Sequence, residues 1–226
     1  MITVKKFVFN PIQENTYVLY DETKQCVIID PGCYTDDEKS QLKSFINNNG
    51  LNPLMVLNTH CHFDHIFGNA YVCKEFGVEL WAHKAEIPNI ERAVPYTSAF
   101  GMVFEESPLP SHYLEDGDEM KFGNSVIKVI HTPGHSPGCV CFYSEADKML
   151  IAGDTLFQDS IGRTDLPGGN YDEIMDSLLD KLMVLPNDTV VYCGHGPNTE
   201  IGKERMYNPL ISEGKMYRDS MRARGK

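Results

Sequence analysis

The sequence has little positive charge, no long apolar run and no closely spaced cysteine pair. Its 20 Lys and Arg residues stand against 32 Asp and Glu residues, which leaves a formal net charge of -12 at pH 7. Such a charge repels polyanions, so nucleic acid is not an expected partner. No apolar run approaches the roughly 20 residues that span a bilayer, which argues against a membrane protein. The segment from Met1 to Lys6 also lacks the apolar stretch of a secretory signal, so we expect a cytoplasmic protein.

The seven cysteines are odd in number, and none belongs to a Cys-x-x-Cys motif. In a chain of 226 residues this pattern does not indicate a disulfide framework. We expect the thiols to be small buried hydrophobes in a reducing compartment. The same interpretation applies to Cys61 and Cys193, although each stands beside a candidate metal ligand.

The composition is that of a folded protein, since 42% of the residues are hydrophobic. A length of 226 residues suits one large domain, and no linker or change of composition divides the chain. We therefore expect a single domain over residues 1–226. Its last part, from about residue 203 to residue 226, is rich in Lys and Arg and is expected to form a basic helical tail that packs on the domain or frays from it.

Short apolar runs alternate with helical patterns along the whole chain. They predict strands at 16–20, 26–29, 54–57, 78–82, 126–130, 139–143, 150–152 and 189–193. Helical spacing predicts helices at 37–49, 66–76, 84–94 and 171–185, the last one capped by Asn170 and Glu173. Residues 95–117 are expected to be an irregular loop of the kind that forms lids. The order indicates an α/β protein with two packed sheets and helices outside them.

Three histidines and an aspartate lie within six positions, at His60, His62, Asp64 and His65. His60 and His62 point to one side of an extended chain, whereas adjacent side chains such as Asp64 and His65 diverge in any regular structure. The four side chains converge only if the chain curves around a common ligand after the strand at 54–57. A pair of metal ions is such a ligand, and we prefer this interpretation to that of a solvated polar loop.

Further ligands are expected from other segments, because one segment does not complete two metal sites. His135, Asp154 and His195 each follow a short apolar strand closely, and each is preceded by a glycine. Glycine lets the backbone approach other groups closely, and catalytic residues collect in loops at strand ends. We therefore expect these three residues to join the cluster. His131 is expected to be structural, and no function is assigned to His83 or His112.

The motifs resemble those of the metallo-β-lactamase superfamily over nearly the whole chain. They are Thr-His-x-His-x-Asp-His at 59–65, Thr-Pro-Gly-His-Ser-x-Gly at 132–138, Gly-Asp-Thr-Leu-Phe at 153–157 and Gly-His-Gly-Pro at 194–197. The resemblance is strongest to the glyoxalase II (hydroxyacylglutathione hydrolase) branch, in its short, single-domain form. It implies the four-layer αββα sandwich of that superfamily. It also implies that the separate C-terminal helical domain, which helps to bind glutathione in glyoxalase II, is missing.

The same resemblance implies two metal sites and a residue that supports them. The first ion would be held by His60, His62 and His135, the second by Asp64, His65 and His195, and Asp154 would bridge the two. Imidazole and carboxylate ligands suit Zn²⁺, and the second site would also accept iron or manganese. Asp30 resembles the family's non-ligand aspartate near the site. We expect it to orient a ligand, with simple turn chemistry as the alternative.

The expected reaction is hydrolysis of a small-molecule thioester. A hydroxide that bridges the ions would attack the carbonyl carbon, and Asp64 would help to orient it. A thiolate leaves readily, so no strong general acid is needed. Arg163 occupies the place of a glutathione-binding basic residue of glyoxalase II, and with Thr164 it would bind substrate; the alternative is a turn salt bridge to Asp165. Asp165 replaces an aromatic residue of that family, which leaves the identity of the thiol open.

Other functions on the same scaffold remain as alternatives. The segment 162–165, Gly-Arg-Thr-Asp, also resembles the persulfide dioxygenases, which are oxidoreductases that bind one iron through two histidines and an aspartate. Here that iron would use His60 or His62 together with His135 and Asp154. A lactonase or a phosphodiesterase would use the same ligands, although the acidic charge argues against a nuclease. A binding module without enzymatic activity is least expected, because all seven ligands are present.

Overall fold

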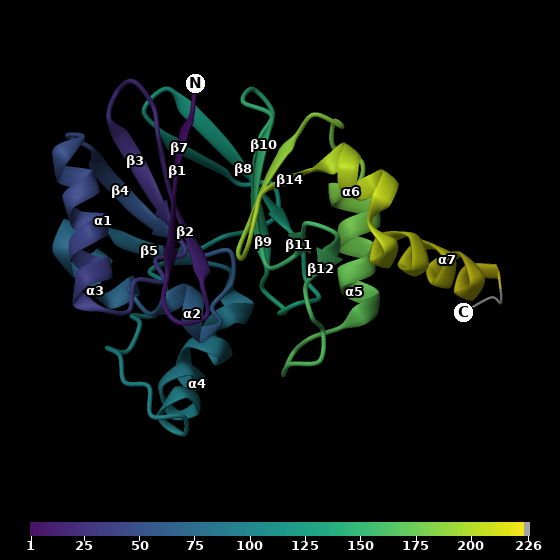
Figure 1. Ribbon diagram of the computed structural model, residues 1–226, viewed down its shortest axis with the longest axis horizontal. Coiled ribbons are helices and arrows are strands. Elements are labelled where there is room, and N and C mark those ends of the chain that lie inside the picture. Colours follow the sequence, from purple (N-terminus) through teal and green to yellow (C-terminus); the bar gives the residue numbers. More distant parts are fainter. Residues whose placement is uncertain (224–226) are drawn as a thin grey trace.

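In a computed structural model, which describes residues 1–223, two six-stranded sheets pack face to face and carry helices on their outer faces (Figure 1). The first sheet has the strand order β1-β2-β3-β4-β5-β6 and the second has the order β14-β13-β10-β9-β8-β7. Helices α1 and α3 cover the first sheet, and α5 and α6 cover the second (Figure 1). The layers confirm the predicted αββα sandwich.

The first sheet is built from an antiparallel hairpin region followed by parallel strands. Its strands are β1 (Thr3–Phe9), β2 (Glu14–Tyr20), β3 (Gln25–Ile29), β4 (Asn52–Leu57), β5 (Glu79–Ala82) and β6 (His112–Tyr113). The helices α1 (Asp36–Asn48) and α3 (Asn69–Phe76) connect the parallel strands β3, β4 and β5. Helix α1 begins with a capping box between Thr35 and Glu38, and it buries Leu42 and Ile46.

The second sheet places three strand ends at one edge. Its strands are β7 (Glu119–Phe122), β8 (Ser125–His131), β9 (Val140–Ser144), β10 (Met149–Gly153), β13 (Val190–Cys193) and β14 (Thr199–Glu200). Strand β9 is antiparallel to β8 and to β10, and β13 is parallel to β10. Strands β8, β10 and β13 therefore run the same way, and the loops after them emerge side by side. A small hairpin of β11 (Leu156–Phe157) and β12 (Ser160–Ile161) follows β10.

The hydrophobic core follows from the two-residue period of the strands. Val27 and Ile29 of β3 face the layer between the sheets, whereas Cys26 and Ile28 face α1 and α3. Strand β10 repeats this division, because Met149 and Ile151 face the first sheet while Leu150 and Ala152 face the helices of the second layer. Strands buried on both faces read as continuous apolar runs, which is why the sequence predicted them well.

The predicted helix at 66–76 is interrupted in the structure. A short helix, α2 (Phe63–Ile66), precedes α3, and the break falls at Gly68. The amide of Gly68 donates to the carbonyl of Pro31 at 2.7 Å, and a Cβ at this position would collide with Cys33 and with that carbonyl. The chain turns here because the loop after β3 packs directly against it, a contact that helical spacing does not reveal.

The boundary between the predicted helix at 84–94 and the predicted loop at 95–117 lies elsewhere in the structure. A 3₁₀ turn, η1 (Lys84–Glu86), leads into α4 (Ile87–Ser98), whose first turn contains Pro88. A proline is tolerated there because the first helical N–H groups have no partner. Helix α4 also continues one turn past Pro95, so the irregular segment starts at residue 99, and β6 lies within the stretch expected to be a loop.

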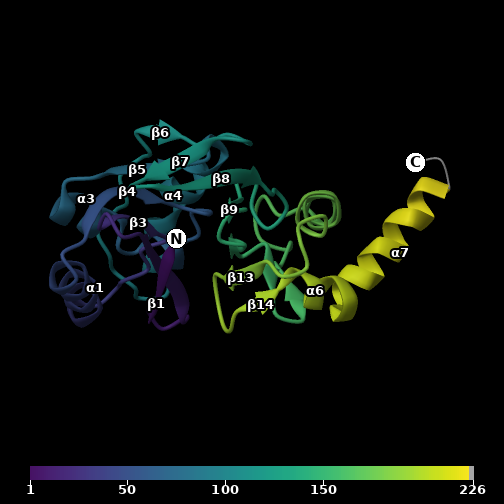
Figure 2. The ribbon, with the colours of Figure 1, turned by 90° about the horizontal axis from the view of Figure 1, so that it is seen from above.

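The last helices cover the second sheet and extend from it. Helix α5 (Tyr171–Asp176) continues into the π-helical segment η2 (Ser177–Leu182), and the Asn170 side chain accepts from the amides of residues 172 and 173, as predicted. Helices α6 (Ile201–Tyr207) and α7 (Pro209–Ala223) form the predicted helical tail, although residues 224–226 of that tail lie outside the described residues. Figure 2 shows α7 projecting from the sheets. None of the described helices is long and apolar enough to cross a bilayer.

Candidate metal centre

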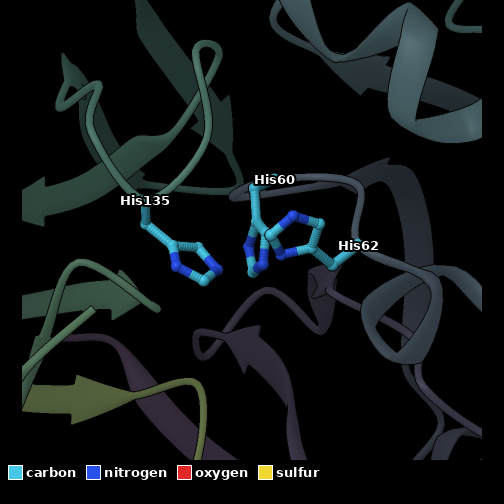
Figure 3. A group of neighbouring side chains, drawn as sticks. All are labelled: His60, His62 and His135. Carbon is cyan, nitrogen blue, oxygen red and sulfur yellow. The ribbon is translucent and has the colours of Figure 1, made fainter. Parts of the chain in front are cut away.

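All seven ligands predicted from the sequence meet where the two sheets come together. Loops after β4, β8, β10 and β13 supply them, and the Val140 amide donates to the Thr59 carbonyl at 2.8 Å to join the sheets at this point. Potential ligand atoms lie within 4.8 Å of one another in two triads that share no residue: His60, His62 and His135 form one, and Asp64, His65 and His195 form the other. A third such group, Asp30, His60 and His65, takes one histidine from each triad. Figure 3 shows the first triad converging from two loops.

The carboxylate of Asp154 lies between the two triads. Its Oδ2 atom is 4.0 Å from Nε2 of His60 and 3.6 Å from Nε2 of His135. On the other side, Nε2 of His65 lies 3.4 Å from Oδ1, and Nε2 of His195 lies 3.6 Å from Oδ2. Asp154 thus lies between two groups of potential ligand atoms.

Three imidazoles are held from behind by acceptors. Nδ1 of His135 lies 2.8 Å from the Arg163 carbonyl, and Nδ1 of His195 lies 3.2 Å from the Gln13 carbonyl. Nδ1 of His65 lies 3.1 Å from a carboxylate oxygen of Asp30. Because carbonyl and carboxylate oxygens only accept, each Nδ1 carries a proton, and Nε2 of each ring faces the centre.

Asp30 also fixes His60, through Thr59. The Thr59 amide donates to Oδ1 of Asp30 at 2.7 Å, and the Thr59 hydroxyl donates to Oδ2 at 2.5 Å. With its proton used in this way, the hydroxyl accepts from Nδ1 of His60 at 3.2 Å. Asp30 therefore orients one imidazole of each triad. This arrangement is the one expected of a residue that orients ligands, the first of the two roles considered for Asp30.

The donor set fits a pair of metal ions. Nε2 of His60, Nε2 of His135 and Oδ1 of Asp154 are buried and have no hydrogen-bond partner among residues 1–223. Buried polar atoms without partners are costly, so these nitrogen and carboxylate donors fit a site that binds cations. Gly194 leaves room for the arrangement, since a Cβ there would collide with Oδ1 of Asp154.

The protonation states follow from burial and from the two carboxylates. Burial lowers the pKa of His60 well below its usual range, and it lowers the pKa of His62 to about 4. Both rings are neutral at pH 7, which is the form that binds a metal ion. Burial opposes a charge on His65 too, but Asp154 and Asp64 outweigh it and raise the pKa of His65. A cation between these carboxylates would take the place of that proton.

Glu86 is an important residue of the centre that the sequence analysis missed. Its side chain is fully buried, and four donors reach it. Oε2 accepts from the Cys61 amide and the Asn89 amide group, each at 2.8 Å. Oε1 accepts from the Ser136 hydroxyl at 2.5 Å and the Gly138 amide at 2.8 Å. Glu86 thus connects the loop of His60 and His62 to the loop of His135. The three partners in these loops stand 25 to 52 positions away, so no local motif reveals the connection.

Strand β2 supports the second triad in a similar way. The Asn15 amide donates to the Gly194 carbonyl at 2.7 Å. The Asn15 side chain and the Tyr17 hydroxyl both donate to the Cys193 carbonyl, at 2.8 Å and 2.6 Å. These bonds hold the loop that carries His195 against the first sheet. No pattern in the sequence indicates these bonds, because residues 16–20 are typical only of an apolar strand.

The remaining singled-out residues lie apart from the ligands. Cys61 and Cys193 are buried, and burial raises the pKa of both thiols, so neither is a ready thiolate. The His131 ring stacks on His83 with centroids 4.3 Å apart, and its Nε2 donates to the Pro137 carbonyl at 3.0 Å. His112 forms an ion pair with Glu79 at the surface.

A cavity of about 420 Å³ opens onto the centre. Its lining comprises Ile12, Cys61, His62, Phe63, Asp64, Asn89, Arg92, Ala93, Tyr96, His135, Asp154, Arg163, Leu166, Pro167 and His195. Arg163 makes a bidentate ion pair with Asp165, with N–O distances of 2.7 and 2.8 Å, so the turn salt bridge considered as an alternative is present. Among the described residues, Thr164 is not part of the lining.

Comparisons with known proteins agree with the fold. The profile of the Metallo-beta-lactamase superfamily matches residues 9–195. The hydroxyacylglutathione hydrolase GloC of Haemophilus influenzae is 33% identical over 202 residues, covering 88% of this chain and 93% of its own. A crystal structure of the BLEG-1 B3 metallo-beta-lactamase is 38% identical with a TM-score of 0.84, covering 93% of this chain and 100% of its own.

A crystal structure of TTHA1623 in a di-iron-bound form is 37% identical with a TM-score of 0.81, covering 91% of this chain and 99% of its own. The matched region includes every residue of the two triads and Asp154. From its motifs, its four layers and these similarities, the chain belongs to the metallo-beta-lactamase superfamily of metal-dependent hydrolases.

Proposed function

We propose that this protein is a thioester hydrolase of the glyoxalase II type that works with two divalent metal ions. The observation that carries the proposal is the pair of ligand triads on either side of Asp154, at the floor of a cavity large enough for a small molecule. The similarity to a hydroxyacylglutathione hydrolase over most of both chains supports the thioester as the substrate class.

In this proposal each triad would hold one ion, and Asp154 would be shared between them. His60, His62 and His135 would hold the first ion, and Asp64, His65 and His195 would hold the second. The ligands suit Zn²⁺, and iron or manganese in the second site is also compatible with them. When bound, the ions supply Lewis acidity, which polarises the thioester carbonyl and lowers the pKa of water at the site.

The chain's own residues then position the reactants. Asp64 lines the cavity, and Oδ2 of Asp64 lies 3.2 Å from Nε2 of His195. Its carboxylate is placed to accept a hydrogen bond from the attacking water and so to orient it. Phe63, Tyr96 and Leu166 form apolar walls that reduce access of bulk water. Because a thiolate leaves without help from a strong acid, the proposed reaction requires no general acid in addition to Asp64.

The test is a panel of substrates with the metal-loaded protein. We expect turnover of thioesters of glutathione, coenzyme A or simple thiols, and little turnover of a chromogenic cephalosporin or bis-aryl phosphate esters. The similarity to a B3 metallo-beta-lactamase makes the cephalosporin the essential comparison. Faster cleavage of the β-lactam than of any thioester would overturn the proposal. So would oxygen consumption with a persulfide by an iron-loaded form, because that activity belongs to a dioxygenase.

A further inference from the structure

We infer that Arg92 forms the anion-binding part of the substrate site, so that the favoured thioesters carry a carboxylate. The inference deepens the proposed function and depends on it for the reacting group. It differs from the expectation drawn from the motif, which gave this role to Arg163. Two guanidinium groups line the cavity, and the structure distinguishes them by what they already bind.

Arg163 is already neutralised by a partner. Both arms of its fork bind the carboxylate of Asp165, and this pairing occupies the geometry with which arginine recognises a carboxylate. The side-chain hydrogen bond from Arg163 lowers the pKa of Asp165 to about 2, so Asp165 is ionised at neutral pH. An incoming carboxylate would have to displace Asp165 from a bond of the same kind.

Arg92 has hydrogen-bond donors that bind no acceptor among residues 1–223. Its Nε donates to the Pro88 carbonyl at 2.8 Å, one turn earlier in α4, and this bond fixes the direction of the side chain. No carboxylate among residues 1–223 lies within ion-pair distance of Arg92, and its Nη groups have no acceptor among those residues. The guanidinium is therefore charged, oriented and free to bind an anion.

The helix around Arg92 presents one face to the cavity. Residues 89, 92, 93 and 96 all line it, and they follow the i, i+3, i+4, i+7 spacing of one helical face. Ala93 is small and Tyr96 is half-exposed, so Arg92 and Tyr96 are the side chains of this face that a ligand meets at the cavity mouth. A thioester whose carbonyl lies at the metal ligands would place its remaining part against this wall.

The chemistry of the wall specifies the ligand class. Apolar side chains surround the middle of the cavity, namely Ile12, Phe63, Leu166 and Pro167. A positive group on α4 then selects an anionic end. In a protein with a net charge of -12, a free arginine in the cavity is a local exception that attracts anions to this place.

Two thioesters that differ only in a carboxylate test the inference. S-acetyl-N-acetylcysteine carries the carboxylate, and S-acetyl-N-acetylcysteamine lacks it. We expect the wild-type protein to favour the anionic probe in kcat/KM by about tenfold, the size of one charge-assisted hydrogen bond at a partly exposed site. In Arg92→Gln this ratio should fall to about one.

Matched variants separate Arg92 from other charges. Arg163→Gln removes the other guanidinium of the cavity, and Lys74→Gln removes an exposed positive charge on α3. We expect both variants to retain the anionic preference. The inference is overturned if Arg92→Gln keeps the wild-type ratio, if Arg163→Gln abolishes it, or if the wild type shows no preference.

A binding measurement separates this inference from the proposed reaction. The S-acetonyl thioethers of the same two thiols have a methylene between sulfur and carbonyl and are not hydrolysed. The metal-loaded wild type should bind the anionic thioether about tenfold more tightly than the neutral one, and Arg92→Gln should bind both equally. If no thioester is hydrolysed but this binding pattern appears, the proposed function fails and the anion site stands. Equal binding of the two thioethers by the wild type contradicts the anion site itself.

Discussion

At the scale of single residues, the imidazoles of the centre are oriented before any ion arrives. His65, His135 and His195 each donate from Nδ1 to an oxygen of the protein, so each presents Nε2 toward Asp154. Such support from behind fixes both the tautomer and the ring orientation of a ligand. The site therefore needs little rearrangement on metal binding.

Replacing His60 by alanine removes one ligand from the first triad. We expect His60→Ala to reduce bound metal from two ions toward one per chain and to lower thioester turnover by about 100-fold or more, while the circular dichroism spectrum stays that of a folded protein. Metal analysis by plasma mass spectrometry and a kinetic assay provide the measurements. His112→Ala, a substitution of the same kind at the surface, serves as the control. Wild-type activity in His60→Ala would contradict the ligand assignment.

Replacing Glu86 by glutamine tests whether the residue positions the ligand loops. The amide NH₂ of glutamine would face the donors that now reach one oxygen of Glu86, so one set of bonds is lost. We expect affinity for the first metal ion to fall by about 10- to 100-fold, as for other residues that hold ligands from behind. Titration with Co²⁺, followed by its visible absorption, measures this affinity.

A matched control for Glu86→Gln is Glu173→Gln, which makes the same change on the exposed face of α5. The control should bind both ions as the wild type does. If Glu86→Gln lowers the melting temperature of the metal-free protein but leaves Co²⁺ affinity and spectrum unchanged, Glu86 supports only the fold.

The candidate ligands and one support, Asp30, were accessible from the sequence, whereas the supports Glu86 and Asn15 were not. The run from His60 to His65, and the glycine before each of His135, Asp154 and His195, are local signals that the sequence alone carries. Glu86 and Asn15 act through partners far away in the chain, and no spacing encodes such pairs. Arg163 shows the opposite case: the motif points to a substrate contact, but Asp165, two residues later, already occupies its guanidinium.

At the scale of elements, a turn of the first sheet is tied to a turn of the second. The carboxylate of Asp21, between β2 and β3, accepts from the Asn124 amide at 2.7 Å and from the Ser125 hydroxyl at 2.9 Å. It also accepts from the Thr23 amide and hydroxyl in its own turn. These bonds join two hairpins, at β2–β3 and β7–β8, across the sandwich.

Asp21→Asn should therefore destabilise the fold in a pH-dependent way. Burial opposes ionisation, but the hydrogen bonds from Thr23 and Ser125 outweigh it and lower the pKa of Asp21 from 3.8 to about 2. A lowered folded-state pKa gives stability that is present above about pH 4 and is lost as the pH falls toward 2. We expect the variant to lose about 2 kcal/mol of unfolding free energy at pH 7, and less at pH 3.

Urea unfolding of the wild type and Asp21→Asn at pH 7, 5 and 3 measures this difference. A constant difference at all three values would mean that the carboxylate charge is not what joins the hairpins. The exposed aspartate of α1, Asp37, provides the control as Asp37→Asn.

Element types were predicted better than element boundaries. Strands that are buried on both faces, such as β3 and β10, were predicted directly from their apolar runs. The break between α2 and α3 did not, because the loop at Pro31 imposes it from another part of the chain. The sequence analysis also ended α4 before Pro95, whereas the helix extends past it. A proline near a helix end removes only one hydrogen bond, and the packing of α4 compensates for that loss.

At the scale of the whole molecule, the metal centre joins the two sheets. Ligands come from loops of both sheets, and the carboxylates of Asp64 and Asp154 lie where the sheets meet. An ion that binds only the folded protein stabilises it by mass action. The centre should thus contribute to the stability of the sandwich as well as to its chemistry.

Removal of the metal by a chelator should lower the melting temperature by about 10 °C or more, the effect of two ions held well above their dissociation constants. Zn²⁺ should restore the transition, whereas Mg²⁺ should not, because imidazole is a poor ligand for Mg²⁺. Scanning calorimetry of the chelated and reloaded protein measures both effects. An unchanged transition would show that the ions do not join the sheets.

The number of metal ions per chain tests the central claim most directly. Equilibrium dialysis of the chelated wild-type protein against Zn²⁺, followed by metal and protein analysis, gives that number. Two triads and a shared Asp154 predict two tightly bound ions per chain. One ion or none at saturation would contradict the two-metal centre on which the proposed reaction depends.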